Sequence, residues 1–336
     1  MTFKARGVAL VVAAAFVAGL PAAALAQRDD KKRSKQEKEE IETLVKIVDG
    51  AMAGEPAPSD VQIAIEPVFL KSQEARMFVP FTLKIDGFPT GKDAALYIRV
   101  VDPTQKADPK KKVEYPWDDI HFVPAAQITG TSVRLHRVFM AKAGTYDVYA
   151  LMKERLPEKS PRNATYKAGL LKTQVVVPDL NAEFTTSSIL VADKVNVLTQ
   201  PLTMDEARER PFSFGLQELE PAADMSFGKN EELSIFFQVY NPGLSATGKP
   251  DLTLEYSFHR KEGAEEKFFN KTNPQAVNES NLPPQFDPAK FPVPGGVTVP
   301  LASFGEGDYR LEIKVTDKTS QKVLTRNVNF SVKATS

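Results

Sequence analysis

The chain has 336 residues and carries 43 Lys and Arg against 43 Asp and Glu, so neither sign of charge dominates. This balance argues against a nucleic-acid-binding protein, which needs clustered positive charge, and against attraction to an anionic membrane surface. The sequence has no cysteine, which excludes disulfides, a thiolate metal site, a thiol nucleophile and a lipid-modified cysteine. Burial of apolar side chains must therefore stabilise the fold.

Residues 1–26 are typical of a secretory signal peptide. Lys4 and Arg6 precede an apolar run from Val8 to Leu20, and small residues ending at Ala26 form a cleavage signature. The apolar run is short for a membrane span, which argues against an uncleaved anchor. We therefore expect a periplasmic or secreted protein without a transmembrane segment, in which 41 positive charges face 43 negative ones after cleavage.

Residues 27–59 are predicted to form a charged leader, one short amphipathic helix and a linker. The leader, residues 27–40, is almost entirely charged or polar, so it cannot bury enough surface to offset its ordering entropy. Apolar residues from Ile41 to Met52 then follow one helical stripe, and residues 55–59 are rich in Pro and Ala. The helix either docks on its own domain or binds a partner, and the sequence leaves both open.

Beyond Asp60 the period of the apolar residues changes to two, which is typical of half-buried β-strands. The clearest strand runs from Met77 to Ile85, and others are predicted at residues 62–69, 96–100, 132–139, 145–153 and 170–177. Because no helical period runs between them, we expect antiparallel sheets rather than a parallel βαβ fold. The first β-sandwich is predicted over residues 60–180.

Residues 181–336 repeat this plan and predict a second β-sandwich. Alternating strands at residues 233–240 and 252–259 are joined through Gly248-Lys249, as the first copy is joined through Gly91-Lys92. Gly144-Thr145-Tyr146 in the first copy corresponds to Gly307-Asp308-Tyr309 in the second. A short helical turn capped by Thr203 is the main addition. The fold class is all-β, with two antiparallel immunoglobulin-like sandwiches.

Each Gly-x-Tyr segment resembles the tyrosine corner of immunoglobulin-like and fibronectin-type sandwiches. That resemblance implies that the hydroxyls of Tyr146 and Tyr309 bond the backbone of the preceding corner. The last third of the chain, including Leu233–Gly243 and Leu301–Lys318, also resembles a module of exported bacterial proteins of unknown function. This second resemblance implies a fold but no activity.

The segment from Tyr115 to Phe122 holds the candidate ligand-binding residues. It combines the only tryptophan with two carboxylates and an imidazole, namely Tyr115, Trp117, Asp118, Asp119 and His121. Carboxylates suit hard cations, His121 with one carboxylate suits zinc, and the two aromatic rings suit a sugar. Alternatively, the segment is a loop or edge strand with Trp117 packed on the sheet and the acids in water. Because calcium-loop and paired-histidine spacings are missing, we predict no metal and no cofactor.

Catalytic residues are not predicted. The other histidines, His136 and His259, fall on strand patterns and are expected to face solvent, and the phosphate-binding and nucleophile-elbow motifs are missing.

Two further surfaces remain open. The proline-rich stretch Pro283–Gly296 is either a docking loop or a connection across the sandwich. A group of aromatic residues forms either an exposed patch or a cover between the two sandwiches. Its members are Phe236, Tyr240, Phe268 and Phe269.

The sequence thus favours a non-catalytic exported binding or scaffold protein of the cell envelope. Its expected partner is another envelope or secreted protein, or a glycan. The alternatives are a carbohydrate-binding enzyme accessory, based on the Trp117 cluster, and a periplasmic chaperone-like assembly factor that adds a client strand to an open sheet edge.

Overall fold

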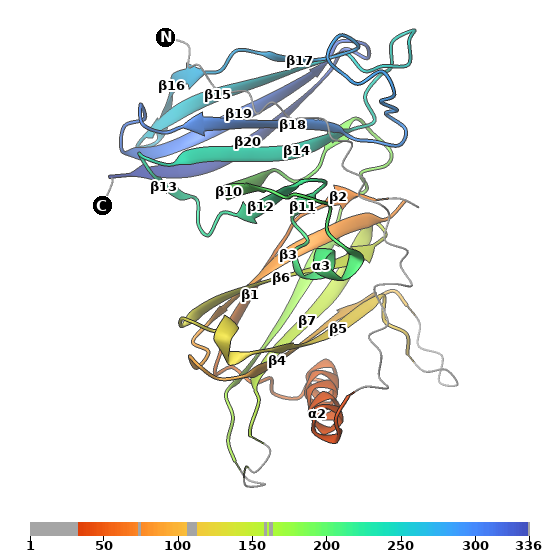
Figure 1. Ribbon diagram of the computed structural model, residues 1–336, viewed down its shortest axis with the longest axis vertical. Helices are drawn as coiled ribbons and strands as arrows, with labels where there is room; N and C mark the ends of the chain where they lie inside the picture. The colour runs from red at the N-terminus through yellow and green to blue at the C-terminus, as the bar shows by residue number, and fades with distance from the viewer. Residues whose placement is uncertain (1–32, 73–74, 106–112, 158–159, 161–163, 335–336) are drawn as a thin grey trace. The chain divides into compact units, whose positions relative to one another are not determined.

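The computed structural model describes residues 33–72, 75–105, 113–157, 160 and 164–334 (Figure 1). The predicted signal peptide and the start of the charged leader lie outside the described residues. The chain is all-β with several antiparallel sheets, so the predicted fold class is confirmed. It divides into two compact units between Asp179 and Leu180, and residues 70–72 belong to the C-terminal unit.

The N-terminal unit encloses its core between two sheets. Trp117 of one sheet packs against Phe81 and Phe139 of the other. Sheet A has the strand order β5 (Trp117–Val123), β4 (Ala94–Val101), β7 (Gly144–Glu154) and β8 (Ala168–Val177). Sheet B contains β1 (Gln62–Pro67), β3 (Met77–Asp86) and β6 (Ser132–Ala141), and a short 3-10 turn, η2 (Ala125–Gln127), follows β5.

The C-terminal unit has the same two-layer plan. Sheet C has the order β11 (Ser213–Phe214), β12 (Gln217–Pro221), β10 (Leu190–Val197), β14 (Glu232–Tyr240) and β18 (Val293–Pro300), with β9 (Thr185–Thr186) also on β14. Sheet D has the order β13 (Ser226–Gly228), β20 (Lys322–Lys333), β19 (Gly307–Asp317), β15 (Leu252–Glu262) and β16 (Glu265–Lys271), with β17 (Gln275–Val277) also on β15. β2 (Leu70–Lys71) lies within residues 70–72, the short segment that belongs to the C-terminal unit although it precedes β3 in the sequence.

Close packing of neighbouring strands within sheet C depends on Gly295 in β18, which is the register partner of Phe237. A Cβ atom at this position would lie 2.4 Å from the ring of Phe237 on β14. Real Cβ atoms do not approach a ring so closely, so the ring occupies the volume that a side chain at 295 would need.

The same hydrogen bond stands at the start of the penultimate strand in both units. The hydroxyl of Tyr146 donates to the carbonyl of Lys142 at 3.1 Å, and that of Tyr309 donates to the carbonyl of Gly305 at 2.9 Å. In each case the preceding glycine has a φ that favours glycine, 155° at Gly144 and 135° at Gly307. These are the bonds that the repeated Gly-x-Tyr segments imply.

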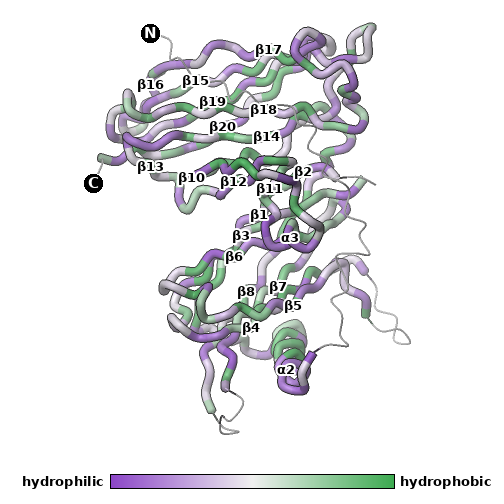
Figure 2. The backbone as a smooth tube through the Cα atoms, in the orientation of Figure 1, coloured by the Kyte–Doolittle hydropathy of each residue, from purple (hydrophilic) through white to green (hydrophobic). Residues whose placement is uncertain are grey.

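Helix α2 (Lys35–Met52) begins at Lys35, so the prediction of a solvated leader up to residue 40 is wrong for residues 35–40. Ser34 caps the helix and Glu37 completes a capping box, which orders this charged turn despite its polarity. Leu44 and Val48 are buried against residues of sheet A, so the interpretation that the helix docks on its own domain is confirmed. Figures 1 and 2 show α2 beside this sheet. Within the described residues, no helix is long and apolar enough to cross a membrane.

The short helix α3 (Met204–Glu209) is capped by Thr203, as predicted. His136 and His259 are less exposed than expected, because both side chains are half-buried. His136 lies 3.0 Å from the Thr82 hydroxyl, and the ring of His259 packs edge-on against Phe268 at 6.0 Å.

The aromatic group does not form one exposed patch. Phe268 is 60% exposed, but Tyr240 is buried and Phe269 packs on the ring of Tyr309. The proline-rich stretch is a connection across the sandwich, because Phe286 is buried in the core and the stretch ends inside β18.

Candidate functional site

Strand alternation separates the candidate ligand-binding residues that the sequence places together. In β5, Trp117 and Asp119 face sheet B, whereas Asp118 faces the opposite side of sheet A. Trp117 is only 8% exposed, with ring centroids 6.2 Å from Phe81 and 6.0 Å from Phe139. It is therefore a core residue, and the hypothesis of an exposed sugar-binding ring is wrong.

Asp119 connects the two sheets of the N-terminal unit. Its carboxylate lies 3.6 Å from the guanidinium of Arg137 on β6, a side chain that is almost fully buried. His121 follows on the same face of β5 and is half-buried. Among the described residues, no group of His, Asp and Glu side chains is arranged to hold a metal ion.

Asp118 and Tyr115 join a charged cluster beneath α2. At its centre, the guanidinium of Arg99 donates to the Tyr97 hydroxyl at 2.9 Å and pairs with Asp49 of α2. The Tyr97 hydroxyl donates to Asp118 at 3.4 Å, and the Tyr115 ring centre lies 4.2 Å from the guanidinium carbon. The side chain of Arg99 is 3% exposed. The cluster therefore places a buried cation between an acid, a phenol and an aromatic face.

The electrostatics of this cluster keep the guanidinium charged and the phenol neutral. Burial, together with the charge of Asp118, raises the pKa of Tyr97 to about 12 despite the opposing effect of Arg99. Burial alone would lower the pKa of Arg99, but its hydrogen bonds with Asp49 and Tyr97 raise the pKa above the ordinary value.

A second ion pair fixes the other end of α2. The ammonium group of Lys153 on β7 lies 2.7 Å from the carboxylate of Glu40, and these side chains are 4% and 12% exposed. The ammonium group also donates to the carbonyl of Glu154 at 3.0 Å and lies 4.2 Å from the ring centre of Tyr166. We call the pairs Glu40–Lys153 and Asp49–Arg99 the α2 seam. Both buried cations thus pair with α2 of their own chain, and the seam joins α2 to sheet A.

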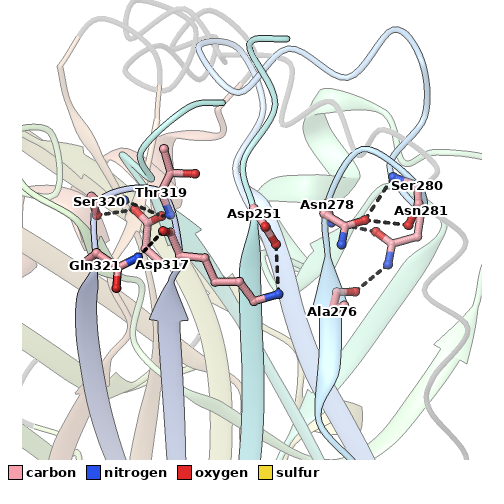
Figure 3. A network of polar contacts seen from close by, with 10 residues as sticks. Asp251, Ala276, Asn278, Ser280, Asn281, Asp317, Thr319, Ser320 and Gln321 are labelled. Atoms are coloured by element: carbon pink, nitrogen blue, oxygen red, sulfur yellow. Dashed lines mark hydrogen bonds and ion pairs between the residues drawn. The ribbon is translucent and has the colours of Figure 1, made fainter. Parts of the chain in front are cut away.

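A second polar network lies at one end of the C-terminal unit, where the loops after β14, β17 and β19 meet (Figure 3). We call residues 241–251, 276–281 and 317–321 the end loops. Asp317 is fully buried and accepts hydrogen bonds from the backbone of Gly243 at 2.6 Å, Thr319 at 2.9 Å and Ser320 at 3.2 Å. Burial alone would raise the pKa of Asp317, but these bonds and that from the Ser320 hydroxyl hold it below its ordinary value.

Further contacts link the end loops to one another. Asp251 pairs with Lys318 at 3.3 Å, and the Thr247 hydroxyl donates to Glu279 at 2.9 Å. Leu244, which forms an isolated β-bridge with Pro250 in the first loop, is nevertheless 47% exposed. The end loops thus present an apolar side chain on a backbone held by hydrogen bonds.

Sequence reasoning missed the end loops. The available signal was Asp317 at the end of an alternating strand, followed by Thr319 and Ser320, a composition typical of side-chain-stabilised turns.

Comparison with protein families finds no family model that matches this chain, and a search of curated proteins finds no match.

Proposed function

We propose that this chain is an exported, non-catalytic binding or scaffold protein that contacts another envelope or secreted protein through the end loops of its C-terminal unit. The observation that carries this proposal is the combination of buried Asp317, which holds two loops together, with Leu244 exposed beside it. Loops that are ordered before binding lose less conformational entropy when a partner docks. Export is supported by the signal-like residues 1–26.

The residues that first suggested chemistry support a structural role instead. Trp117 fills the core, Asp119 pairs with Arg137, and Arg99 and Lys153 hold α2. We also propose that both units are immunoglobulin-like or fibronectin-type modules, which the two tyrosine hydrogen bonds support. Such modules commonly bind partners through the loops at one end of the sandwich.

Site-specific photocrosslinking in the native envelope tests the proposal. A crosslinking residue at Leu244 should capture one protein that the same residue at Val176, 65% exposed on β8, does not capture. The purified partner should bind the wild-type chain and bind Leu244→Asp at least tenfold more weakly. Equal capture at both positions contradicts the binding surface. Turnover of a glycan, ester or peptide that is abolished by one polar substitution contradicts the non-catalytic assignment.

A second candidate is addition of a client strand to the edge of sheet D. Within the described part of the chain, β16 pairs with β15 alone, and it carries Phe268 with 60% of its surface exposed. An extended client could hydrogen-bond to this edge and cover that ring. In that case Phe268→Glu abolishes co-purification of the client, whereas Val323→Glu, at a 52% exposed position on β20, retains it. Equal co-purification with both variants rejects this candidate.

A further inference from the structure

We propose that the face of sheet A beneath α2 is also a docking site for the α2 helix of a second copy of this chain, so that two chains exchange their N-terminal helices. This inference does not depend on the proposed binding function, because the exchange uses a different surface in the N-terminal unit.

The face beneath α2 is unusually rich in cations that lie on aromatic rings. Each cation–π pair found among the described residues lies in or next to sheet A, with the charge between 4.2 and 5.6 Å from the ring centre. Such a surface attracts acidic groups, since the rings orient the cations without neutralising them. The pairs are Arg99 with Tyr97 and Tyr115, Lys153 with Tyr166, Arg155 with Phe122, and Lys172 with Tyr149.

Helix α2 shows which ligand this face accepts. Glu40 and Asp49 meet the two buried cations near its ends, and Leu44 and Val48 fill the apolar middle between them. Only these two apolar side chains of the described helix are fully buried. The charges therefore add specificity to a small hydrophobic contact, and the α2 of a second copy carries the same charges at the same spacing.

The segment that joins α2 to the first strand has the features of a hinge. Residues 53–57 are all exposed, and Gly54 has a φ of 94°. Just beyond them the chain is fixed to β8, because the backbone N–H of Leu170 donates to Pro58 at 2.9 Å and Ser59 bridges Gly169. Opening the hinge would change the backbone conformation of the five exposed residues 53–57 and leave α2 and sheet A intact.

An exchanged pair would keep every contact of the closed chain. Its stability then depends on protein concentration, hinge strain and loop-closure entropy, rather than on a new interface. We therefore expect a dimer whose fraction rises with concentration and with shortening of the hinge.

Mixed thiol crosslinking tests the exchange, and the absence of native cysteine leaves no competing thiol. Because Glu40 and Lys153 meet through the ends of long side chains, cysteines at these positions need a short bismaleimide to join them. Mature chains carrying Glu40→Cys are mixed with chains carrying Lys153→Cys at high concentration, under mild denaturant followed by its removal, and are then crosslinked. Exchange predicts a crosslinked heterodimer at least tenfold more abundant than with Glu42→Cys, which lies on the exposed side of α2. If the double variant Glu40→Cys/Lys153→Cys crosslinks within one chain while the mixture gives no heterodimer, the inference is overturned.

A second measurement avoids substitution in the seam. Deleting residues 55–57 should prevent α2 from reaching its own face, so light scattering should find mostly dimer where the full hinge gives mostly monomer. A shortened chain that stays monomeric over a hundredfold range of concentration, with its helical circular dichroism retained, also overturns the inference.

Discussion

The two ion pairs of the α2 seam provide a sharp test of how burial sets the strength of a charge interaction. In Glu40–Lys153 the side chains are 12% and 4% exposed, whereas Asp49 in the other pair is 55% exposed. Removing one partner of a buried ion pair costs roughly 3–5 kcal/mol, because the remaining charge stays uncompensated. A pair open to water is screened and contributes about 1 kcal/mol or less.

We therefore expect Glu40→Gln to lower the free energy of unfolding of the N-terminal unit by about 3 kcal/mol, since glutamine keeps one acceptor but removes the charge. Asp49→Asn should cost about 1 kcal/mol, because Asp49 is 55% exposed and the buried Arg99 guanidinium keeps its hydrogen bond with the Tyr97 hydroxyl and its contact with the Tyr115 ring. Glu42→Gln, on the exposed side of the same helix, should change stability by less than about 0.5 kcal/mol.

Urea unfolding followed by tryptophan fluorescence measures these differences in stability for the N-terminal unit. Trp117 is the only tryptophan and lies in the N-terminal core, so its emission follows that unit alone. With a slope of about 2 kcal/mol per M, Glu40→Gln should lower the midpoint by about 1.5 M.

The double variant Glu40→Leu/Lys153→Met provides the matched control. Because it leaves neither buried charge, it should be more stable than Glu40→Gln. Equal costs for Glu40→Gln and Asp49→Asn, or a double variant weaker than Glu40→Gln, would refute the burial argument.

Other substitutions test the packing and the turns. Gly169→Ala would place a Cβ 2.0 Å from the Val61 carbonyl, so it should destabilise the N-terminal unit by about 3 kcal/mol, whereas Gly130→Ala, whose Cβ would lie no nearer than 3.8 Å to the backbone of Ser132, should be neutral in the same urea assay. Tyr309→Phe removes one hydrogen bond and should lower the stability of the C-terminal unit by about 1 kcal/mol in thermal circular dichroism. The lowered pKa of Asp317 gives stability that is present above its ordinary value of 3.8 and is lost as pH falls through the folded-state value. Asp317→Asn should therefore lower the free energy of unfolding of the C-terminal unit at pH 7. It should also reduce the loss of stability at acidic pH, measured by hydrogen exchange over a pH series; an unchanged pH dependence contradicts this role.

Periodicity predicted most of the strands because alternate residues of a strand point to the same face of a sheet. Met77–Ile85 lies within β3, Met77–Asp86, although residues 77–83 are buried on both faces, and the alternation at residues 233–240 lies within β14. Composition alone does not predict the start of α2, because the first turn of the helix is as charged as a solvated leader. Ser34 and Glu37 are nevertheless a recognisable helix-start pair within that charged run.

The candidate site was harder to predict because side chains that are adjacent in the sequence of a strand point to opposite faces of the sheet. Trp117 and Asp118 point to opposite faces of sheet A, so one faces the core and the other reaches the Arg99 cluster. The partner of Lys153 lies 113 residues earlier, at Glu40, a separation that no local pattern reveals. The alternative with Trp117 packed in an edge strand required only local information, and it agrees with β5 at the end of sheet A, whereas its expectation that both acids face water is wrong for Asp119, which pairs with Arg137.

The glycine at position 295 constrains how related sequences can vary. Since the Phe237 ring occupies the space of any side chain there, the two positions cannot change independently. A homologue with alanine or serine at 295 should carry a smaller residue, such as valine or leucine, at 237. Such paired substitution across an alignment would identify chains that share this sandwich even where little else in their sequences agrees.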